Sequence, residues 1–260
     1  MGSRRTIDLN ADVGEAADDA GVAVERGLLA LVSSAHVACG GHAGDEATMR
    51  ATVEAAMSAG IRVGAHPSYP DRQGFGRRSM EMERSELSSS LREQIAALVD
   101  VARACGTAVR SVKAHGALYA DVALGGSEYV ALAVAVAELC DPGTALVLPS
   151  GTAAAVLARD AGLPVLEEGF CDRAYGADGA LVSRQVPGSV FDDPEVAAAQ
   201  ALGLARDGMV TAQGGEQLAL HVDTLCLHGD SPNALAMARA VRAVLEQDGI
   251  EMAAAVVRHP

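Results

Sequence analysis

The sequence has no tryptophan, and aromatic residues make up only 3% of its 260 residues although half of the chain is hydrophobic. Its core must therefore be built mainly from alanine, valine and leucine. No apolar run approaches the roughly 18 residues that a membrane-spanning helix needs. The N-terminal residues enter the first expected strand without an apolar segment, so we expect no secretory signal and no membrane partner.

Positive charge and nucleotide-binding motifs are also scarce. The 20 Lys and Arg residues are outnumbered by 34 Asp and Glu, which gives a formal net charge of −14. Nucleic acids and anionic membranes bind positive patches, so we expect neither as the main partner. The sequence contains neither G-x-x-x-x-G-K-[ST] nor G-x-G-x-x-G, which argues against a P-loop or a Rossmann nucleotide site.

The five cysteines contain no C-x-x-C pair, and their odd number leaves one over in any disulfide scheme. Reduced thiols are typical of the cytoplasm, where we expect the protein to act. Cys39 and Cys226 lie beside polar clusters and are candidate nucleophiles, although a small buried thiol is more often a packing residue.

What the sequence does have is four short apolar segments that end in polar side chains, at 7–12, 61–66, 112–115 and 225–230. Because side chains alternate along a strand, Asp8, Asn10 and Asp12 share one face, and Lys113 shares a face with His115. Strands that carry polar side chains to their carboxyl ends are typical of the active site of a β/α barrel or doubly wound sheet. The pattern indicates an enzyme.

Strand and helix patterns alternate along the whole chain. We expect strands near 5–10, 34–39, 61–66, 109–115, 144–148, 164–167 and 221–228. Helices are expected near 18–32, 45–59, 84–105, 127–140, 152–161, 194–207 and 231–248. The alternation predicts a parallel sheet with right-handed crossovers, and seven strands predict a closed or nearly closed α/β barrel. No linker interrupts the pattern, so we predict one domain over residues 1–260.

The first strand supplies the candidate acids. Asp12 lies nearest the end of this strand and is the preferred general acid or base. The alternative is that the acids of the strand only form hydrogen bonds at the floor of the barrel, with Glu15 exposed to solvent. His42 follows two glycines and His66 ends a neighbouring strand, so these two could form a metal site with Asp12. A metal-free acid role for them is equally compatible with the spacing.

Lys113 and His115 come from the fourth strand. Lys113 could bind a carboxylate or stabilise an oxyanion, or it could form a structural ion pair with Asp8 or Asp12. His228, after the last strand, completes the expected ring of polar residues. The other histidines are expected to be structural or surface residues: His36, His221 and His259.

Two loops carry further candidates. Residues 69–78 contain three arginines, Arg77 among them, and residues 170–184 contain Arg173. Arginines concentrated in long loops are suited to binding an anionic substrate group or to closing a lid, although a single arginine is more often solvated.

Seven blocks follow one another in order along the chain: 8–15 (DLNADVGE), 38–45 (ACGGHAGD), 64–71 (GAHPSYPD), 74–78 (GFGRR), 112–119 (VKAHGALY), 168–175 (EGFCDRAY) and 226–230 (CLHGD). Together they resemble the LamB/YcsF family. The sequence departs from the family pattern at Ala11 (usually Cys), Gly41 (aromatic), His36 (Asn) and Ala114 (Pro). The absence of a thiol at position 11 counts against a catalytic cysteine there, and Gly41 would leave the pocket roomier.

The resemblance implies a seven-stranded β/α barrel of the glycoside hydrolase/deacetylase type. It also implies a component of an ATP-dependent 5-oxoprolinase, acting with subunits B and C and also able to form a homo-oligomer. Such an enzyme opens the lactam of 5-oxo-L-proline to L-glutamate while ATP, as co-substrate, becomes ADP and phosphate. ATP and Mg²⁺ would then be handled by the partner subunits.

The mechanistic hypothesis has two sets of residues. The catalytic residues would be Asp12, His66, Lys113 and His115. The substrate-binding residues would be Asp8, Asn10, His42, Arg77, Arg173 and His228. The alternatives are a metal-dependent deacetylase or amidohydrolase that acts on a small carbohydrate or amide without ATP, and a non-catalytic scaffold protein of the same complex.

Overall fold

Seven parallel strands form a closed barrel in the computed structural model, which describes residues 5–229, 231 and 233–256. The strands are β1 (Thr6–Val13), β2 (Ser34–Ala38), β3 (Arg62–His66), β4 (Ser111–Lys113), β5 (Ala145–Pro149), β6 (Val165–Phe170) and β9 (Thr224–Leu227). They pair in this order, and β9 pairs with both β6 and β1, which closes the barrel. The predicted barrel is therefore confirmed. Asp230 and His259 lie outside the described residues.

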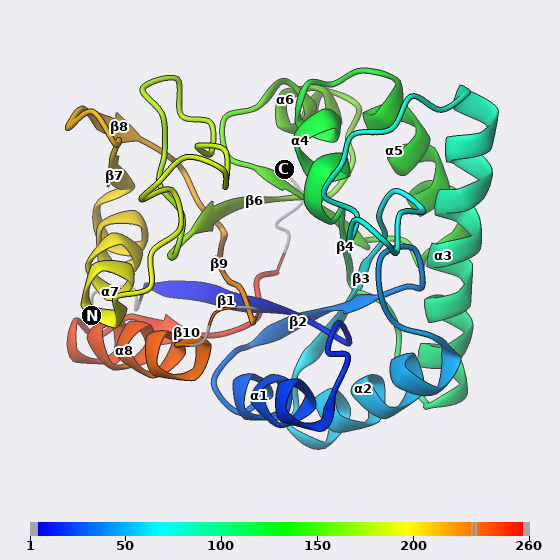
Figure 1. The fold of residues 1–260 in the computed structure, drawn as a ribbon, viewed down its shortest axis with the longest axis horizontal. Coiled ribbons are helices and arrows are strands. Elements are labelled where there is room, and N and C mark those ends of the chain that lie inside the picture. The colour runs from blue at the N-terminus through cyan, green and yellow to red at the C-terminus, as the bar shows by residue number, and fades with distance from the viewer. Residues whose placement is uncertain (1–4, 230, 232, 257–260) are drawn as a thin grey trace.

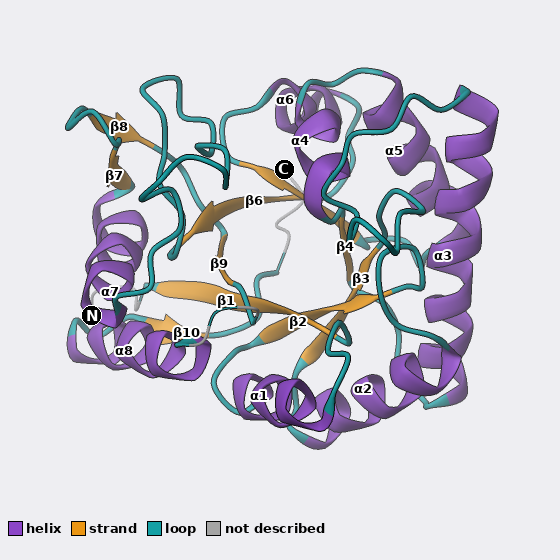
Figure 2. Ribbon diagram, in the orientation of Figure 1, coloured by secondary structure: helices purple, strands orange, loops and turns teal. Residues whose placement is uncertain are grey.

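Helices surround the barrel and pack on its outer face (Figure 1). They are α1 (Asp19–Leu29), α2 (Glu46–Ser58), α3 (Arg84–Ala104), α5 (Ser127–Leu139), α6 (Ala153–Asp160), α7 (Pro194–Leu202) and α8 (Ala234–Gln247). Each lies within the range expected from the sequence, except that the last turns before residue 208 form a π-helix, η1 (Gly203–Asp207). Loops connect the strands to the surrounding helices (Figure 2).

Four short elements were not expected. A short helix, α4 (Gly116–Ala123), follows β4 directly. An antiparallel hairpin, β7 (Met209–Thr211) and β8 (Gln217–Ala219), lies apart from the barrel. A two-residue strand, β10 (Glu251–Met252), pairs in parallel with Thr6 and Ile7 at the start of β1.

Local sequence signals explain where α2 begins and ends. The Asp45 side chain accepts a hydrogen bond from the Thr48 N–H at 2.8 Å and caps the helix, as predicted. Gly60 follows the last turn with a φ of +73°, a conformation that glycine adopts without strain. The helix thus delivers the chain into β3 with its polar end residue, His66, at the site.

The two faces of the strands differ sharply. Outward-facing residues of β1 to β9 are buried aliphatic side chains that pack on the helices, for example Leu9, Val37, Val63 and Leu225. The inward-facing residues are mostly polar and buried: Asp8, Asn10, Asp12, Ser34, His36, His66, Ser111, Lys113, Glu168 and Thr224. The barrel therefore has its apolar core outside the strands and a polar network inside them.

Among the described residues, no single helix is both long and apolar enough to cross a membrane. The bent pair α4 and α5 would pass that test together by length and composition only, with an angle of 103° between its two helices.

Candidate functional site

A cavity of about 560 Å³ opens at the carboxyl ends of the barrel strands. Seven of the ten residues predicted for the site line it: Asp12, His66, Arg77, Lys113, His115, Arg173 and His228. They come from five different strands or the loops that follow them, so the fold brings together residues far apart in the sequence. The other three predicted residues, Asp8, Asn10 and His42, lie behind this lining.

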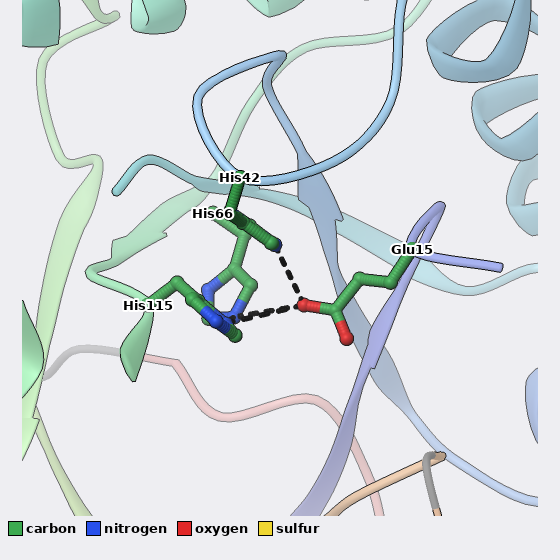
Figure 3. Close-up of side chains that lie close together, drawn as sticks. All are labelled: Glu15, His42, His66 and His115. Carbon is green, nitrogen blue, oxygen red and sulfur yellow. Dashed lines mark hydrogen bonds and ion pairs between the residues drawn. The ribbon is translucent and has the colours of Figure 1, made fainter. Parts of the chain in front are cut away.

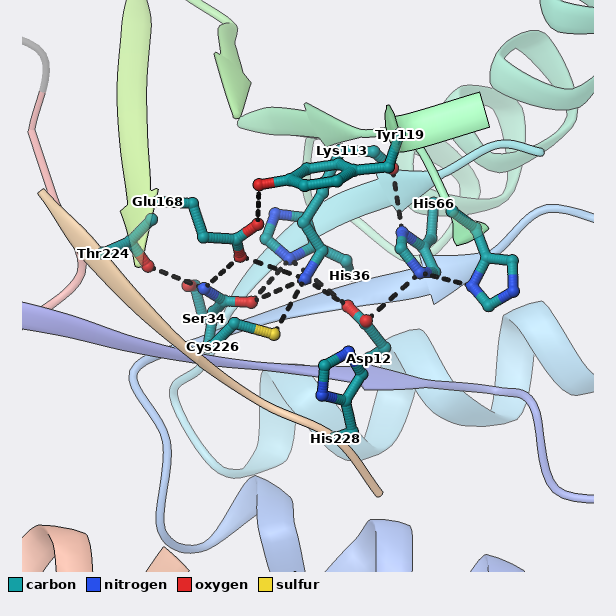
Figure 4. A network of polar contacts seen from close by, with 12 residues as sticks. Asp12, Ser34, His36, His66, Lys113, Tyr119, Glu168, Thr224, Cys226 and His228 are labelled. Carbon is teal, nitrogen blue, oxygen red and sulfur yellow. Dashed lines mark hydrogen bonds and ion pairs between the residues drawn. The ribbon is translucent and has the colours of Figure 1, made fainter. Parts of the chain in front are cut away.

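A buried ammonium group forms the floor of the cavity (Figure 4). Lys113 Nζ lies 2.6 Å from Asp12 Oδ1 and 3.1 Å from Glu168 Oε1, and it also contacts Asn10 Oδ1 at 3.0 Å. Burial alone would lower the pKa of Lys113, but the charge of Asp12 and the neighbouring Glu168 outweigh it and raise that pKa well above its ordinary value. Lys113 is therefore a cation held by protein carboxylates.

Asp12 lies between Lys113 and His66. Its Oδ2 lies 3.3 Å from His66 Nε2, on the opposite side from Lys113. Burial would raise the pKa of Asp12, but the charges of His66 and Lys113 hold that pKa well below its ordinary value. Of the two ion pairs that the sequence allowed for Lys113, the structure contains the one with Asp12 and not the one with Asp8.

A second cluster joins Glu15 to three histidines (Figure 3). Glu15 Oε1 lies 2.8 Å from His42 Nε2, 3.2 Å from His115 Nδ1 and 3.6 Å from His66 Nε2. The structure does not contain the solvated Glu15 that the sequence left open as the alternative, because this side chain is only 13% exposed. Glu15 is held there because β1 continues to Val13 and Gly14, at a φ of +75°, turns the chain back toward β2.

Burial and hydrogen bonds set the protonation of this cluster. Burial would raise the pKa of Glu15, but hydrogen bonds to His115 and His42 lower it. Burial lowers the pKa of His42 to about 4 and also lowers that of His115. For His66, burial is outweighed by the charge of Asp12, and its pKa is raised.

Two backbone carbonyl groups orient the imidazoles. His66 Nδ1 lies 2.8 Å from Lys113 O, and His115 Nε2 lies 2.9 Å from Phe75 O. A carbonyl oxygen can only accept, so these two nitrogens carry the protons. The opposite nitrogens, His66 Nε2 and His115 Nδ1, then face each other at 3.1 Å.

The loop after β3 is clamped above this cluster. Asp71 accepts from Arg78 Nε at 2.9 Å and from the Gly74 N–H at 2.8 Å. Phe75 has a positive φ of 54°, an unusual conformation for a residue other than glycine, and its carbonyl oxygen receives the His115 hydrogen bond. The Arg77 guanidinium lies 5.0 Å from the centre of the Phe75 ring. The loop therefore places Arg77 on the wall of the cavity.

Arg173 is anchored on the other wall. Its Nε donates to Ser189 O at 3.3 Å and its terminal nitrogen donates to Val182 O at 2.7 Å. Burial lowers its pKa to about 10, so it remains charged at neutral pH. His228 is held beside it by Asp172, at 2.9 Å from His228 Nδ1, and its ring stacks on Phe170.

Three predicted residues support the site from below or behind. Asp8 lies at the opposite mouth of the barrel, where its carboxylate accepts from Ser33 at 2.6 Å and Ser34 at 2.7 Å. Asn10 donates to Glu168 and accepts from Lys113, one layer beneath the cavity. His42 stacks on His115 with ring centroids 3.7 Å apart.

Sequence reasoning missed Glu168 and Tyr119. Glu168 binds Lys113, and its other oxygen accepts from the Tyr119 hydroxyl at 2.6 Å. The signal was present for Glu168, because strand alternation from Leu166 places it inside the barrel, but the strand was expected to end at 167. Tyr119 belongs to the unexpected helix α4. The sequence interpretation of His36 as structural agrees with its place among Asn10 and Ser111, where its pKa is lowered by burial.

The cysteines beside the site are not poised as nucleophiles. Cys226 Sγ lies 3.3 Å from Lys113 Nζ, but burial raises the pKa of its thiol well above the ordinary value. Burial likewise raises the pKa of Cys39 to about 12. A nucleophilic cysteine needs a lowered pKa, so the packing role is the better interpretation.

Comparison with known proteins identifies the family. The LamB/YcsF family model matches residues 7–259. The A subunit of 5-oxoprolinase from Methylococcus capsulatus is 46% identical over 250 residues, covering 96% of each chain. A 5-oxoprolinase A subunit from Pseudomonas syringae pv. tomato, numbered 3 in that organism, is 44% identical over 243 residues, covering 94% of each chain.

Solved structures agree with this result. A lactam utilization protein from Thermus thermophilus superposes with a TM-score of 0.87 at 43% identity, covering 96% of this chain and 99% of that one. A family 4 carbohydrate esterase from Streptomyces lividans has a TM-score of 0.51 at 13% identity, covering 96% and 93%, and shares the fold alone. The ordered sequence blocks, the seven-stranded barrel and these matches together show that the chain belongs to the LamB/YcsF family.

Proposed function

We propose that the cavity opens the lactam ring of 5-oxo-L-proline to L-glutamate, as the A component of a cytoplasmic, ATP-dependent 5-oxoprolinase. The observation that carries the proposal is the arrangement of charge around the cavity. Asp12, Glu15 and two histidines lie together on one side of it, and Arg77 and Arg173 lie on the walls. Relatives 44 to 46% identical are named as the A subunit of 5-oxoprolinase, which supports the same reaction.

The substrate matches this division of the site. 5-Oxo-L-proline has one carboxylate and one lactam, both on a five-membered ring. A planar guanidinium binds a carboxylate through two parallel hydrogen bonds, so Arg77 and Arg173 would hold the carboxylate. His228, oriented by Asp172, would contact the same end of the ring. The lactam carbonyl would then face the floor of the cavity.

The acids and histidines would activate the water that attacks the lactam carbon. Asp12 is a carboxylate fixed between Lys113 and His66, and it would orient the water with His66 and His115. Lys113 would place positive charge beneath the developing oxyanion. Because its ammonium already binds Asp12 and Glu168, its main effect would be to position Asp12 rather than to bind the substrate directly.

ATP would enter through the partner subunits. A lactam is a resonance-stabilised amide, and phosphorylation of its oxygen by ATP would make the ring carbon more electrophilic. Water would add to that carbon, the C–N bond would break with the ring nitrogen leaving as a protonated amine, and a second water would hydrolyse the resulting acyl phosphate to glutamate and phosphate. The chain contains no P-loop or Rossmann motif, which favours nucleotide and Mg²⁺ binding on subunits B and C. The proposed role of this chain is then the hydrolytic step.

The test is release of glutamate and phosphate from 5-oxo-L-proline and ATP, by this chain alone and mixed with subunits B and C. Coupled release of both products in the mixture, and only there, is the expected result. Absence of glutamate release in a mixture of three folded subunits would reject the proposal.

A further inference from the structure

Three donor atoms face one another at the edge of the cavity with the spacing of metal ligands (Figure 3). His66 Nε2, His115 Nδ1 and Glu15 Oε1 form a triangle with sides of 3.1, 3.2 and 3.6 Å. Tetrahedral zinc with bonds of about 2.0–2.1 Å holds its ligands about 3.3–3.4 Å apart. The sides of the triangle bracket that distance, so the side chains would need little movement to bind an ion.

The lone pairs of both imidazoles point into the triangle. The carbonyl groups of Lys113 and Phe75 fix the protons on the far nitrogens, which leaves His66 Nε2 and His115 Nδ1 as acceptors when the rings are neutral. Two acceptors and a carboxylate oxygen repel one another unless a cation lies among them. One proton can bridge only one pair of these three atoms, whereas a metal ion binds all three.

Each of the three ligands also has the outer partner that metal ligands usually have. The two carbonyl groups serve the histidines, and His42 Nε2 lies 2.8 Å from Glu15 Oε1. His42 itself does not fit as a ligand beside His115. Their rings are stacked at 5°, so one ion could not lie in both ring planes, whereas the rings of His66 and His115 meet at 88°.

A second possible group, formed by Asp12, Cys226 and His228, is already neutralised. Lys113 Nζ lies 2.6 Å from the Asp12 carboxylate and 3.3 Å from the Cys226 sulfur. A divalent ion there would have to displace or repel this ammonium. This argument disfavours the second group as the site of an ion and favours the cluster of Glu15, His66 and His115.

We propose that Glu15, His66 and His115 bind a zinc ion, with His42 as the outer hydrogen-bond partner of Glu15. Nitrogen donors outnumber oxygen donors in this set, which favours zinc over magnesium or calcium. Three protein ligands leave a fourth position, and all three line the cavity. This set differs from the one the sequence indicated, because Asp12 faces Lys113 and His42 lies behind Glu15.

A bound zinc ion supplies a water of lowered pKa and polarises an adjacent carbonyl oxygen. Asp12, 3.3 Å from His66 Nε2, lies where its carboxylate would accept a hydrogen bond from that water. This catalytic role rests on the proposed lactam hydrolysis, whereas the binding of the ion does not.

The experiment measures metal on the full chain without substrate or partner subunits. The protein is stripped with a chelator, incubated with Zn²⁺ and dialysed, and bound zinc is measured by elemental analysis and by competition with a chromophoric chelator. We expect one zinc per chain. Glu15→Gln and His115→Ala should each weaken binding by about 100-fold or more, and His42→Ala by about 10–100-fold.

A matched control is His221→Gln, because the His221 side chain is 73% exposed and lies outside the cavity. It should bind zinc as the wild type does. Circular dichroism and urea unfolding of each variant separate loss of the site from loss of the fold. Replacement by Co²⁺ adds a measurement on the unmutated protein: its visible spectrum should be that of nitrogen and oxygen ligands in a tetrahedral field.

The inference is overturned if the wild type holds no stoichiometric zinc, or if the folded ligand variants bind it equally well. Thiolate charge-transfer bands in the Co²⁺ spectrum would also overturn it, since they would assign the ion to cysteines. If the chain binds no zinc, the proposal of lactam hydrolysis is unaffected. If the mixture of subunits is inactive, the measurement of zinc binding is unaffected.

Discussion

Replacement of Asp12 by asparagine separates catalysis from stability at this site. The change keeps the shape of the side chain and removes its charge. Lys113 loses its 2.6 Å ion pair but keeps Glu168 at 3.1 Å and Asn10 at 3.0 Å. Removal of one partner of a buried ion pair costs about 3–5 kcal/mol, and the remaining carboxylate should keep the loss near or below about 3 kcal/mol. The variant should therefore fold.

Turnover should fall much further than stability. A positioned acid or base contributes about 10²–10⁴-fold to rate, and asparagine cannot accept a proton from water. The assay is glutamate release by the complete subunit mixture at saturating 5-oxo-L-proline and ATP. Urea unfolding of the isolated chain gives the stability of the same preparation.

Glu167→Gln is the matched control. Glu167 is as buried as Glu168, but it points outward from β6 and pairs with Arg159 on α6. Its replacement should lower stability and leave turnover unchanged. A folded Asp12→Asn chain with turnover within about tenfold of the wild type would refute the catalytic assignment. An Asp12→Asn chain that does not fold would instead refute the reasoning that Glu168 suffices to hold Lys113.

Three further outcomes follow from single contacts. Lys113→Met leaves the buried carboxylates of Asp12 and Glu168 without their shared ammonium group. The free energy of unfolding in urea should fall by about 3–5 kcal/mol, and a loss below about 1 kcal/mol would contradict the importance of these ion pairs. Unfolded His36 takes up a proton near its ordinary pKa of 6.5, but the buried side chain, whose pKa is lowered, stays neutral to a lower pH. Its contribution is therefore complete above about pH 6.5 and is lost as pH falls below that value, by up to about 1.4 kcal/mol per pH unit. His36→Asn should reduce the pH dependence of the free energy of unfolding between pH 7 and about pH 5 by that amount, and the part that remains would come from His42 and His115, whose pKa values are also lowered. Gly116 has a φ of +59°, and a Cβ there would lie 2.5 Å from Gly76 O. Gly116→Ala should therefore lower the free energy of unfolding by at least about 1 kcal/mol and reduce turnover. An unchanged melting temperature would show that the close approach of these two backbone segments does not require glycine.

The barrel was predictable because its strands carry a strong local signal. In β1, the alternation of Ile7, Leu9 and Ala11 with polar residues marks one face for the helices and the other for the interior. The missed elements have weak signals. Helix α4 spans only eight residues, and glycine occupies its first position. Strand β10 has two residues, too few to show any period.

The residues that line the site were more predictable from the sequence than the contacts they make with one another. Strand-end positions identified Asp12, His66, Lys113 and His115, because all parallel strands end at the same mouth of the barrel. Which acid meets which histidine depends on loop conformation and strand register. Glu15 follows the strand and turns back toward the histidines, and no periodicity in the sequence encodes that turn.

The polar interior of this barrel is difficult to explain by stability alone. β/α barrels usually fill the interior with branched aliphatic side chains, and replacing a buried ion pair by such residues is often neutral or stabilising. Here the Asn10 side chain contacts Thr224, Lys113 and Glu168 inside the barrel. Lys113 in turn forms an ion pair with Asp12, which lines the cavity. Buried polar side chains that are linked by several such contacts hold one another in fixed positions. Its function is then best explained as positioning: it fixes a carboxylate and an ammonium at the cavity floor, where a mobile side chain would lose the geometry that hydrolysis requires.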